Sequence, residues 1–373
     1  MSQAANASAG AGSRYRAAIV GCGRIAYEHG RAYDADPRVE LVACADIDAD
    51  ATLRFAEAFG LTGGYGDYRE MVKREQPDIV SICTHHHLHA TMTIETVGLA
   101  CPKAILCEKP IALDLRSADA MIAACRAAST LLVVGHQRRY DRQYAAARDV
   151  VASGALGEVV FVEAFGHPGS SLLVDSTHTV DLVRFFLGDP RGEWAIGQID
   201  ARGHRVGWGQ PIEACAVGWI GLEGGVRLLL GAGSAGGDGS ADRIRISPRP
   251  VTGRTYHRIV VHGSTGRLEV NGDGPNDGEA LVCIHRGRDV ETVFSADDFE
   301  SDPSFSACAL EVAAMVDCLE QPGLRHPLEA QSARDTLEIL LAVYESSRRR
   351  QLVNLPLDVD DNPFISMLEA GVV

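Results

Sequence analysis

Short apolar runs alternate with amphipathic segments through the first third of the chain. The runs that we interpret as buried strands are Arg16–Val20, Glu40–Ala45, Asp78–Cys83, Ala104–Cys107 and Leu131–Gly135. Helix-like segments separate them, the clearest being Ala49–Phe59 and Ser117–Ala128. Buried strands that alternate with helices are typical of a parallel sheet covered on both faces. We therefore predict a parallel α/β domain over residues 14–136.

The pattern changes after about Tyr140. Positions that alternate between apolar and polar then mark the predicted strands Glu158–Phe165, Glu213–Leu222, Val226–Leu230 and His257–His262. This alternation predicts an open, mainly antiparallel sheet, while Gly231–Pro250 is rich enough in Gly and Ser to predict a loop. Two predicted helices, about Pro303–Leu319 and Leu328–Arg349, close the chain. The predicted fold class is α/β, with a second α/β domain over 137–373 and a disordered tail over 1–13.

Composition narrows the possible partners. The formal net charge of −15 argues against binding to nucleic acid or to an anionic membrane surface, because both require basic patches. No run approaches the roughly 18 apolar residues of a membrane-spanning helix, and the first residues lack the apolar core of a signal peptide. The 10 cysteines form no CxxC pair, so we expect them to be reduced. We expect a soluble, cytoplasmic protein.

The segment GCGRIA (residues 21–26) fits the pattern G-x-G-x-x-G/A, follows a predicted strand and opens a predicted helix. This context is typical of a Rossmann dinucleotide site, in which the phosphates lie at a helix N-terminus. An aspartate at the end of the next strand is placed to accept the ribose hydroxyls, and Asp48 and Asp50 add negative charge that favours NAD over NADP. The cofactor-binding residues predicted from this pattern are Gly21, Gly23, Arg24, Ile25, Ala26 and Asp46. The alternative is a glycine-rich turn that binds no ligand.

Five further segments along the chain carry a resemblance to a known family. They are Glu108-Lys109-Pro110 within ILCEKPIAL, SICTHHHLHA (81–90), GHQRRYD (135–141), SGALGEV (153–159) and LEILLAVYESSRRRQLVNLP (337–356). Together with the glycine-rich turn they resemble the glucose–fructose oxidoreductase/inositol dehydrogenase/MocA family over most of the chain. Members mostly oxidise or reduce a sugar or cyclitol carbon with NAD(P), and the resemblance implies the same here.

Lys109 is the predicted proton relay. Interconversion of a carbinol and a ketone needs a group that moves the hydroxyl proton while hydride moves to nicotinamide. A lysine at the carboxyl end of a parallel strand lies where such sheets bind ligands. We expect partial burial and a nearby cation to lower its pKa from about 10.4 toward the working range. The alternative is a surface lysine paired with a carboxylate, which is our interpretation of Lys73 and Lys103.

His178 is the second predicted catalytic residue. Apolar spacing places it in the first turn of a helix that ends at Gly188, and a helix N-terminus disfavours imidazole protonation. The family commonly has an aspartate four positions before this histidine, where this chain has Val174. Asp175, three positions before, shares a helix face with His178. Asp175 therefore either assists catalysis or only caps the helix.

The resemblance implies further roles. Thr84 and His86 are expected beside the nicotinamide ribose, His89 is expected to close the same loop, and Glu108 joins Lys109 at the cofactor. Arg138 and Arg139 either reach cofactor or substrate oxygens, as the resemblance implies, or form surface ion pairs. We predict no metal site in the histidine cluster 85–89, because adjacent histidines in a loop rarely face one centre.

The sequence thus predicts an NAD-dependent oxidoreductase that acts on a sugar, cyclitol or related polyol carbon and forms a homo-oligomer, a dimer or a tetramer. Two alternatives remain open. One is a glycoside hydrolase or lyase that keeps NAD tightly bound and oxidises its substrate transiently. The other is a regulatory protein that senses NAD without turnover.

Overall fold

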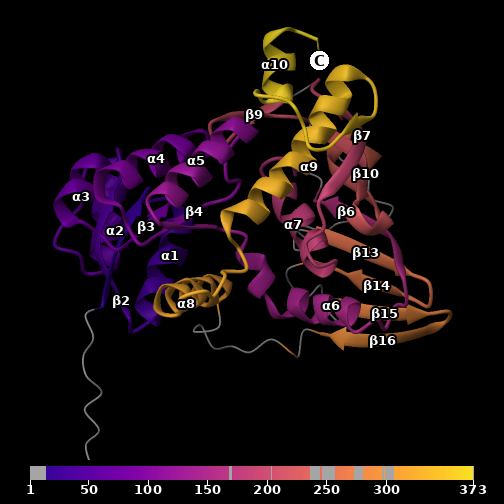
Figure 1. The fold of residues 1–373 in the computed structure, drawn as a ribbon, viewed down its shortest axis with the longest axis horizontal. Coiled ribbons are helices and arrows are strands. Elements are labelled where there is room, and N and C mark those ends of the chain that lie inside the picture. The colour runs from indigo at the N-terminus through magenta and orange to yellow at the C-terminus, as the bar shows by residue number, and fades with distance from the viewer. Residues whose placement is uncertain are drawn as a thin grey trace, which may run out of the picture.

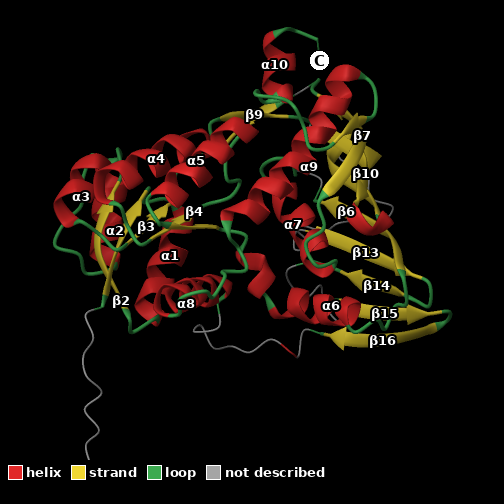
Figure 2. Cartoon of the chain, viewed as in Figure 1, coloured by secondary structure: helices red, strands yellow, loops and turns green. Residues whose placement is uncertain are grey.

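Two β-sheets form the framework of the computed structural model, which describes residues 14–167, 170–202, 204–235, 244–245, 257–272, 280–295, 298 and 306–372. The sheets lie side by side, and helix α9 (Ala330–Arg349) runs between them (Figures 1 and 2). Helix α9 packs on strand β7 of the second sheet and also contacts α5 and β5 of the first. The predicted α/β class with two sheets is confirmed, while the predicted tail over 1–13 lies outside the described residues.

The first sheet is entirely parallel, in the order β2-β1-β3-β4-β5. Its strands are β1 (Tyr15–Val20), β2 (Val39–Ala45), β3 (Ile79–Ile82), β4 (Ala104–Cys107) and β5 (Leu131–Val134). Every residue of β3 and β4 is buried, as expected for a parallel sheet covered on both faces. All the strands point the same way, so their carboxyl ends meet at one edge.

Five helices connect these strands. They are α1 (Arg24–Ala35), α2 (Ala49–Ala58), α3 (Tyr68–Glu75), α4 (His89–Ala100) and α5 (Leu115–Ala127). Aspartate side chains cap three of them: Asp48, Asp67 and Asp114 accept backbone N–H groups at the starts of α2, α3 and α5. The sequence analysis named no helix over α3. A short helix, η1 (His86–Leu88), precedes α4, and another, η2 (Gln137–Tyr140), follows β5.

The second sheet is mixed, with antiparallel pairing throughout except where β6 and β11 run parallel. Its order is β16-β15-β14-β13-β6-β11-β10-β7-β17, and β12 pairs with β11. The strands are β6 (Val159–Gly166), β7 (Gly192–Asp200), β10 (Cys215–Leu222), β11 (Arg227–Ala235), β12 (Ile244–Arg245), β13 (His257–Gly263), β14 (Arg267–Val270), β15 (Val282–Arg286), β16 (Asp289–Phe294) and β17 (Val353–Asn354). A separate hairpin, β8 (Arg205–Gly207) and β9 (Gln210–Ile212), extends from it.

The loop predicted over Gly231–Pro250 is partly wrong. Strand β11 continues to Ala235, with Gly231 opposite Val217 and Gly233 opposite Cys215. Pairing with β10 hydrogen-bonds the glycine backbone, and this tertiary contact outweighs the weak strand propensity of Gly. Strand β12 adds a second short element at 244–245, while residues 236–243 and 246–250 lie outside the described part of the chain.

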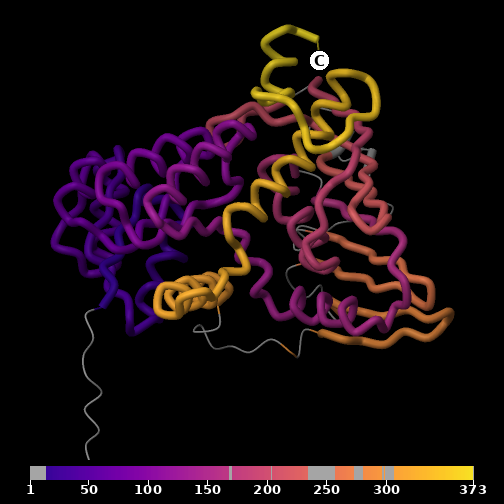
Figure 3. Tube along the Cα trace, viewed as in Figure 1, coloured from indigo at the N-terminus to yellow at the C-terminus, as the bar shows by residue number. Residues whose placement is uncertain are grey.

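The helices of the second half divide between the two sheets. Helices α6 (Arg142–Ala152) and α7 (Ser176–Phe186) pack on the second sheet, and α10 (Pro363–Glu369) packs on α9. Helix α8 (Ala307–Glu320) instead packs on α1, so that a late segment of the chain lies beside the first one (Figure 3). The core of the first sheet thus includes residues from both ends of the chain, although the domain limits 14–136 and 137–373 stay predictions. No described helix is long and apolar enough to span a membrane.

Arg139 in η2 is a buried ionic anchor between the two halves. Its guanidinium donates to both carboxylate oxygens of Asp181 on α7, at 2.8 and 2.7 Å, and to both of Asp189 after α7, at 3.0 and 2.6 Å. Arg139 and Asp181 are 4% and 1% exposed, which places the pair in the interior. The ion-pair alternative for Arg139 is therefore the one observed, with a buried pair in place of a surface one.

Replacement of Arg139 by Met tests this anchor. The substitution leaves the Asp181 carboxylate buried without its cation, so we expect the free energy of unfolding to fall by about 3–5 kcal/mol. Urea denaturation followed by circular dichroism measures the loss. The matched control is Arg202→Met, which removes an 89% exposed side chain paired with Asp200 and should cost at most about 1 kcal/mol. Equal losses in the two variants contradict the assigned role.

Candidate functional site

The glycine-rich turn lies at the carboxyl end of β1 and opens α1. Gly21 has a φ of +91°, and a Cβ there would lie 2.7 Å from the carbonyl oxygen of Cys83 at the end of β3. Both the backbone conformation and the space therefore require glycine. Gly23 is the N-cap residue of α1, and a Cβ on it would meet nothing within 4 Å, so the space before the helix is open. An open helix N-terminus fits a phosphate group.

Asp46 joins this turn to the end of β2. One carboxylate oxygen accepts the backbone N–H of Cys22 at 2.7 Å, and the other accepts that of Asp48 at 2.9 Å. The half-buried carboxylate therefore lies against the turn, where its remaining lone pairs fit ribose hydroxyls. Ala26 is fully buried, which allows α1 to pack closely on the sheet. Arg24 and Ile25 begin the helix. This donor set fits an NAD cofactor, which would be held by the turn, the helix start and Asp46.

Lys109 follows β4 at the same edge of the first sheet. Its half-buried side chain donates from Nζ to the backbone carbonyl of Val174 at 2.8 Å, just before α7. Burial lowers the pKa of Lys109 below its ordinary value, the Glu108 and Asp175 charges oppose this, and Arg138 adds to the lowering. A lysine with a lowered pKa at the ligand edge of a parallel sheet is suited to exchange a proton with a bound molecule.

His178 lies in the first turn of α7 and is 3% exposed. Burial lowers its pKa well below the ordinary value, and the Lys109 and Arg138 charges add to this effect. The imidazole is therefore neutral, as the sequence analysis expected, although the main cause is burial and not the helix terminus. His136 and His257 lie beside it, with ring centroids at 5.5 and 6.2 Å. Neither of these histidines was predicted as a site residue.

Asp175 occupies the N-cap position of α7, yet its side chain does not cap the helix. Its carboxylate accepts the backbone N–H of Ser171 at 3.0 Å and lies 3.9 Å from Nε2 of His167. The capping alternative is therefore not what the structure shows. The Asp175 charge raises the pKa of Lys109, and the backbone of Val174 supplies the hydrogen-bond acceptor for the same amine.

His89 and Glu108, both predicted at the cofactor, make hydrogen bonds within the protein, and His89 lies where it closes its loop, as the resemblance implies. His89 is fully buried, with Nδ1 2.8 Å from the Pro110 carbonyl and Nε2 3.1 Å from the Thr84 carbonyl. Both ring nitrogens face the backbone, so His89 ties two loops together and offers a cofactor no polar atom. Glu108 is 7% exposed, and Oε1 lies 3.1 Å from Nε2 of His29. Its carboxylate is therefore hydrogen-bonded to a side chain inside the protein.

The remaining predicted residues are Thr84, His86 and Arg138. The Thr84 hydroxyl donates to the sulfur of Met92 at 3.3 Å. Burial, with the neighbouring charges of His89 and Lys109, lowers the pKa of His86 to about 3, so that ring is neutral. Arg138 in η2 contributes positive charge that lowers the pKa values of Lys109 and His178. Within the described ranges, no group of three His, Cys, Asp or Glu side chains is placed to hold a metal ion.

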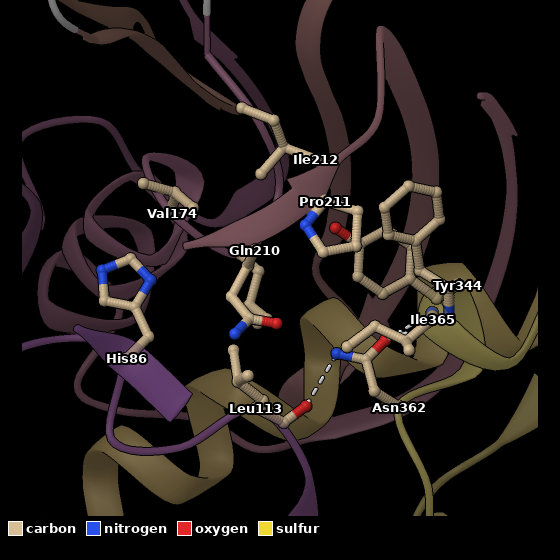
Figure 4. Close-up of a pocket in the computed structure, with 11 residues that line it drawn as sticks. His86, Leu113, Val174, Gln210, Pro211, Ile212, Tyr344, Asn362 and Ile365 are labelled. Atoms are coloured by element: carbon tan, nitrogen blue, oxygen red, sulfur yellow. Dashed lines mark hydrogen bonds between the residues drawn. The ribbon is translucent and has the colours of Figure 1, made fainter. Parts of the chain in front are cut away.

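A pocket opens between the two halves of the chain beside Val174 and His86 (Figure 4). Gln210, Pro211 and Ile212 of β9 form one wall, with the Gln210 amide facing the hollow. The other lining residues are Leu113 after β4, Leu173 before α7, Tyr344 on α9, and Asn362, Phe364 and Ile365 at α10. Asn362 is already committed, since it donates to the Leu113 carbonyl at 2.8 Å and caps α10. The pocket therefore has apolar walls and an amide that faces the hollow.

Some of these residues left no signal in the sequence. His136 stands within the segment GHQRRYD and could have been noted there. His257 on β13, Gln210 on β9 and Asn362 near the C-terminus are distant in the sequence from every motif. Only the packing of the second sheet and of α10 brings them to the site.

Replacement of Gly21 by Ala tests the nucleotide turn. The new Cβ collides with the Cys83 carbonyl in a left-handed backbone conformation, so we expect the affinity for NAD to fall at least about tenfold. Isothermal titration calorimetry measures this. Gly60→Ala is the matched control, because Gly60 also has positive φ (+66°) but stands in open space after α2. NAD affinity equal to wild type in G21A contradicts this placement of the cofactor.

Comparison with known proteins agrees with this geometry. Residues 15–136 match the profile of the family described as "Oxidoreductase family, NAD-binding Rossmann fold". The chain is 30% identical to an inositol 2-dehydrogenase of Rhizobium meliloti over 70% of this chain and 76% of the relative. It is 27% identical to a D-apiose dehydrogenase of Paraburkholderia graminis over 96% of this chain and 95% of the relative.

Solved structures share the whole fold. A levoglucosan dehydrogenase in complex with NADH and levoglucosan superposes with a TM-score of 0.74 at 18% identity, over 92% of this chain and 100% of that one. A myo-inositol 2-dehydrogenase from Lactobacillus plantarum gives 0.70 at 21% identity, over 92% and 99%. The sequence matches and the glycine-rich turn beside Asp46 lead to one conclusion: this chain belongs to the glucose–fructose oxidoreductase/inositol dehydrogenase/MocA family of NAD-binding oxidoreductases.

Proposed function

We propose that the protein oxidises a secondary hydroxyl of a sugar or cyclitol to a ketone, or catalyses the reverse reduction, with Lys109 as the proton relay. The observation that carries this proposal is the amine of Lys109, which has a lowered pKa and is held by the carbonyl of Val174, a residue that lines the pocket. The names of the inositol and D-apiose dehydrogenases support the substrate class, because both act on small polyhydroxylated molecules.

The reaction divides its proton and its hydride between different groups. Bound NAD supplies the acceptor for the hydride that leaves the carbinol carbon. The neutral Lys109 amine takes the hydroxyl proton, and the carbon–oxygen bond becomes a carbonyl. The neutral imidazole of His178 hydrogen-bonds the same hydroxyl and helps to deprotonate it. Asp175 tunes Lys109, since its charge stabilises the protonated form of that amine.

The lining of the hollow beside Val174, which measures about 300 Å³ including open solvent, is the proposed outer wall of the substrate site. The Gln210 amide has both a donor and an acceptor, which suits a pair of neighbouring hydroxyls. Leu113, Ile212 and Ile365 are apolar and suit the carbon faces of a ring. His86, which lines the same pocket and is neutral, connects it with the proposed cofactor site.

Replacement of Lys109 by Met tests the relay. We expect kcat for NAD-linked oxidation to fall by about 10²–10⁴-fold while NAD still binds, because Met cannot exchange a proton. Absorbance at 340 nm with a panel of inositols, pentoses and hexoses measures kcat. Lys103→Met is the matched control, since Lys103 is 58% exposed and pairs with Asp78 away from the site.

The pH dependence has a definite sign. Oxidation needs the neutral amine, so its rate falls as the pH decreases through the lowered pKa of Lys109, and reduction shows the opposite dependence. NADH that accumulates with product distinguishes this reaction from hydrolysis or elimination with retained NAD. No turnover with any polyol, while NAD still binds, contradicts the proposed function.

We also propose that the outer face of the second sheet pairs with a second copy of the chain. Ile196, Val217 and Trp219 are 38–47% exposed on β7 and β10. Phe161 stacks on Trp219 with ring centroids 5.3 Å apart, which makes the face flat and aromatic. Helices α6, α7 and α9 pack on the sheet. A broad apolar face on a sheet suits a closed, symmetric dimer.

Replacement of Trp219 by Asp tests this interface. A charge at the centre of a buried apolar face is costly, so we expect the sedimentation coefficient to shift from that of an oligomer to that of a monomer of 39.8 kDa. Leu53→Asp is the control, because Leu53 is 57% exposed on α2, far from the second sheet. A monomeric wild type, or an oligomer that survives W219D, contradicts the proposal.

A further inference from the structure

A buried chain of polar side chains leads from α1 to the residue before Lys109. The Tyr33 hydroxyl lies 2.5 Å from Oγ of Ser81, Oγ lies 2.9 Å from Nδ1 of His29, and Nε2 of His29 lies 3.1 Å from Oε1 of Glu108. The other carboxylate oxygen accepts the backbone N–H of Lys109 at 3.1 Å. Three elements of the first sheet and its cover, α1, β3 and the end of β4, thus meet in one hydrogen-bonded chain.

The hydrogen bond to Glu108 has a direction that follows from chemistry. A carboxylate only accepts, so His29 carries a proton on Nε2 and donates it to Glu108. The other ring nitrogen, Nδ1, faces the Ser81 hydroxyl and lies 3.5 Å from Sγ of Cys83, and the Ser81 hydroxyl is hydrogen-bonded to that of Tyr33. Buried hydrogen bonds in series polarise one another, and the donor from His29 favours the ionised carboxylate.

The Glu108 carboxylate occupies a buried space between strand ends. Tyr33, His29 and Ser81 are at most 1% exposed, and Glu108 is 7% exposed. A Cβ on Gly135, after β5, would lie 3.0 Å from Oε1 of Glu108. The glycine of GHQRRYD therefore lets the carboxylate fit between two strand ends, close to the backbone of Lys109.

The charge of Glu108 affects the pKa of Lys109. Burial raises the pKa of Glu108, but the His29 hydrogen bond and the Lys109 charge outweigh it, so the carboxyl is ionised. Glu108 in turn is the largest influence that opposes the burial of Lys109. Glu311 on α8 also faces this region, and burial keeps its pKa well above the ordinary value, so it adds no charge. The other charged or titratable groups around Lys109 are Arg24 on α1, His86 on η1, His136 and Arg138 at η2, Asp175 and His178 at α7, and His257 on β13.

We propose that His29 is a positioning residue that holds the Glu108 carboxylate ionised and fixed beside Lys109, with Ser81 and Tyr33 holding its imidazole in the required orientation. This arrangement affects the pKa of the proton relay, Lys109. Burial lowers the pKa of Lys109, and Glu108 and Asp175 are the anions that oppose this lowering. Glu108, kept charged by His29, raises the pKa of Lys109 so that the amine both takes and returns a proton. The inference rests on the proposed function of Lys109.

The scarcity of lysine makes a direct test possible. The chain has three lysines, Lys73, Lys103 and Lys109, so protein labelled with 13Cε-lysine gives three signals. Loss of one signal in Lys109→Arg assigns that residue, and Lys73 and Lys103 serve as internal references. A pH titration of the full chain then reports the protonation of Lys109 without cofactor, substrate or turnover.

Three substitutions probe the chain. In His29→Leu the buried Glu108 loses its donor and takes a proton, so we expect the titration midpoint of Lys109 to fall by about one pH unit. Glu108→Gln removes the same charge and should cause a similar fall. Tyr33→Phe removes only the last hydroxyl and should cause a smaller one. His29→Gln can still donate to Glu108 and should restore part of the loss.

The controls separate positioning from stability. His326→Leu removes another buried histidine, 3% exposed, whose ring nitrogens contact only the backbone of Glu311 and Leu328. It should lower the melting temperature and leave the Lys109 midpoint unchanged. In the double variant H29L/E108Q the midpoint should equal that of E108Q alone, because both changes act on one charge.

The outcomes are distinct from those of the activity test. A midpoint in H29L equal to wild type, while E108Q shifts it, overturns the role of His29. No shift in either variant overturns the role of Glu108 as well. If H29L does not fold, Y33F and E108Q decide, and a wild-type midpoint in Y33F while E108Q shifts it overturns the role of the hydrogen-bonded chain. Where activity is measurable, the acid limb of oxidation should move to lower pH with the NMR midpoint; failure to find a substrate leaves the titration valid.

Discussion

The hydrogen bond from Lys109 to the Val174 carbonyl is the contact on which the site depends. It joins the carboxyl edge of the parallel sheet to the start of α7, which packs on the second sheet. Because the acceptor is a backbone carbonyl, the amine is held without a carboxylate in direct contact, and its pKa stays lowered. Relatives of this family commonly have aspartate at the position of Val174. Here that position contributes its backbone carbonyl, and the nearby Glu108 and Asp175 supply the negative charge.

The site combines neutral rings with a few balanced charges. Burial keeps His136, His178 and His257 neutral, with pKa values lowered from the ordinary range. The cations Arg138 and Lys109 strengthen this effect on His178. Neutral imidazoles are hydrogen-bond partners that neither repel a cationic amine nor bind a stray anion. The low polarity of this region makes each remaining charge effective, which is why one carboxylate beside Lys109 has a large influence.

Packing between the two halves of the chain fixes the positions of these groups. Arg139 holds η2 against α7 through Asp181 and Asp189, so Arg138, its neighbour, is directed by a rigid turn. Helix α8 returns to α1 and encloses the polar chain that ends at Glu108. The C-terminal residues around Asn362 complete the pocket wall. Segments far apart in sequence therefore contribute to one site, and each is fixed by contacts made elsewhere.

The sequence by itself determined the parallel sheet, the nucleotide turn and the position of Lys109 at a strand end. These depend on local patterns, since apolar runs, a glycine-rich turn and an aspartate at the next strand end are all read within short windows. Only the tertiary structure showed that His89 binds backbone carbonyls, that β11 extends through Gly231–Ala235, and that Asp175 does not cap its helix. It alone brought His29 to Glu108. These outcomes depend on long-range pairing and burial, which set hydrogen-bond partners and pKa values and leave no periodic trace in the chain.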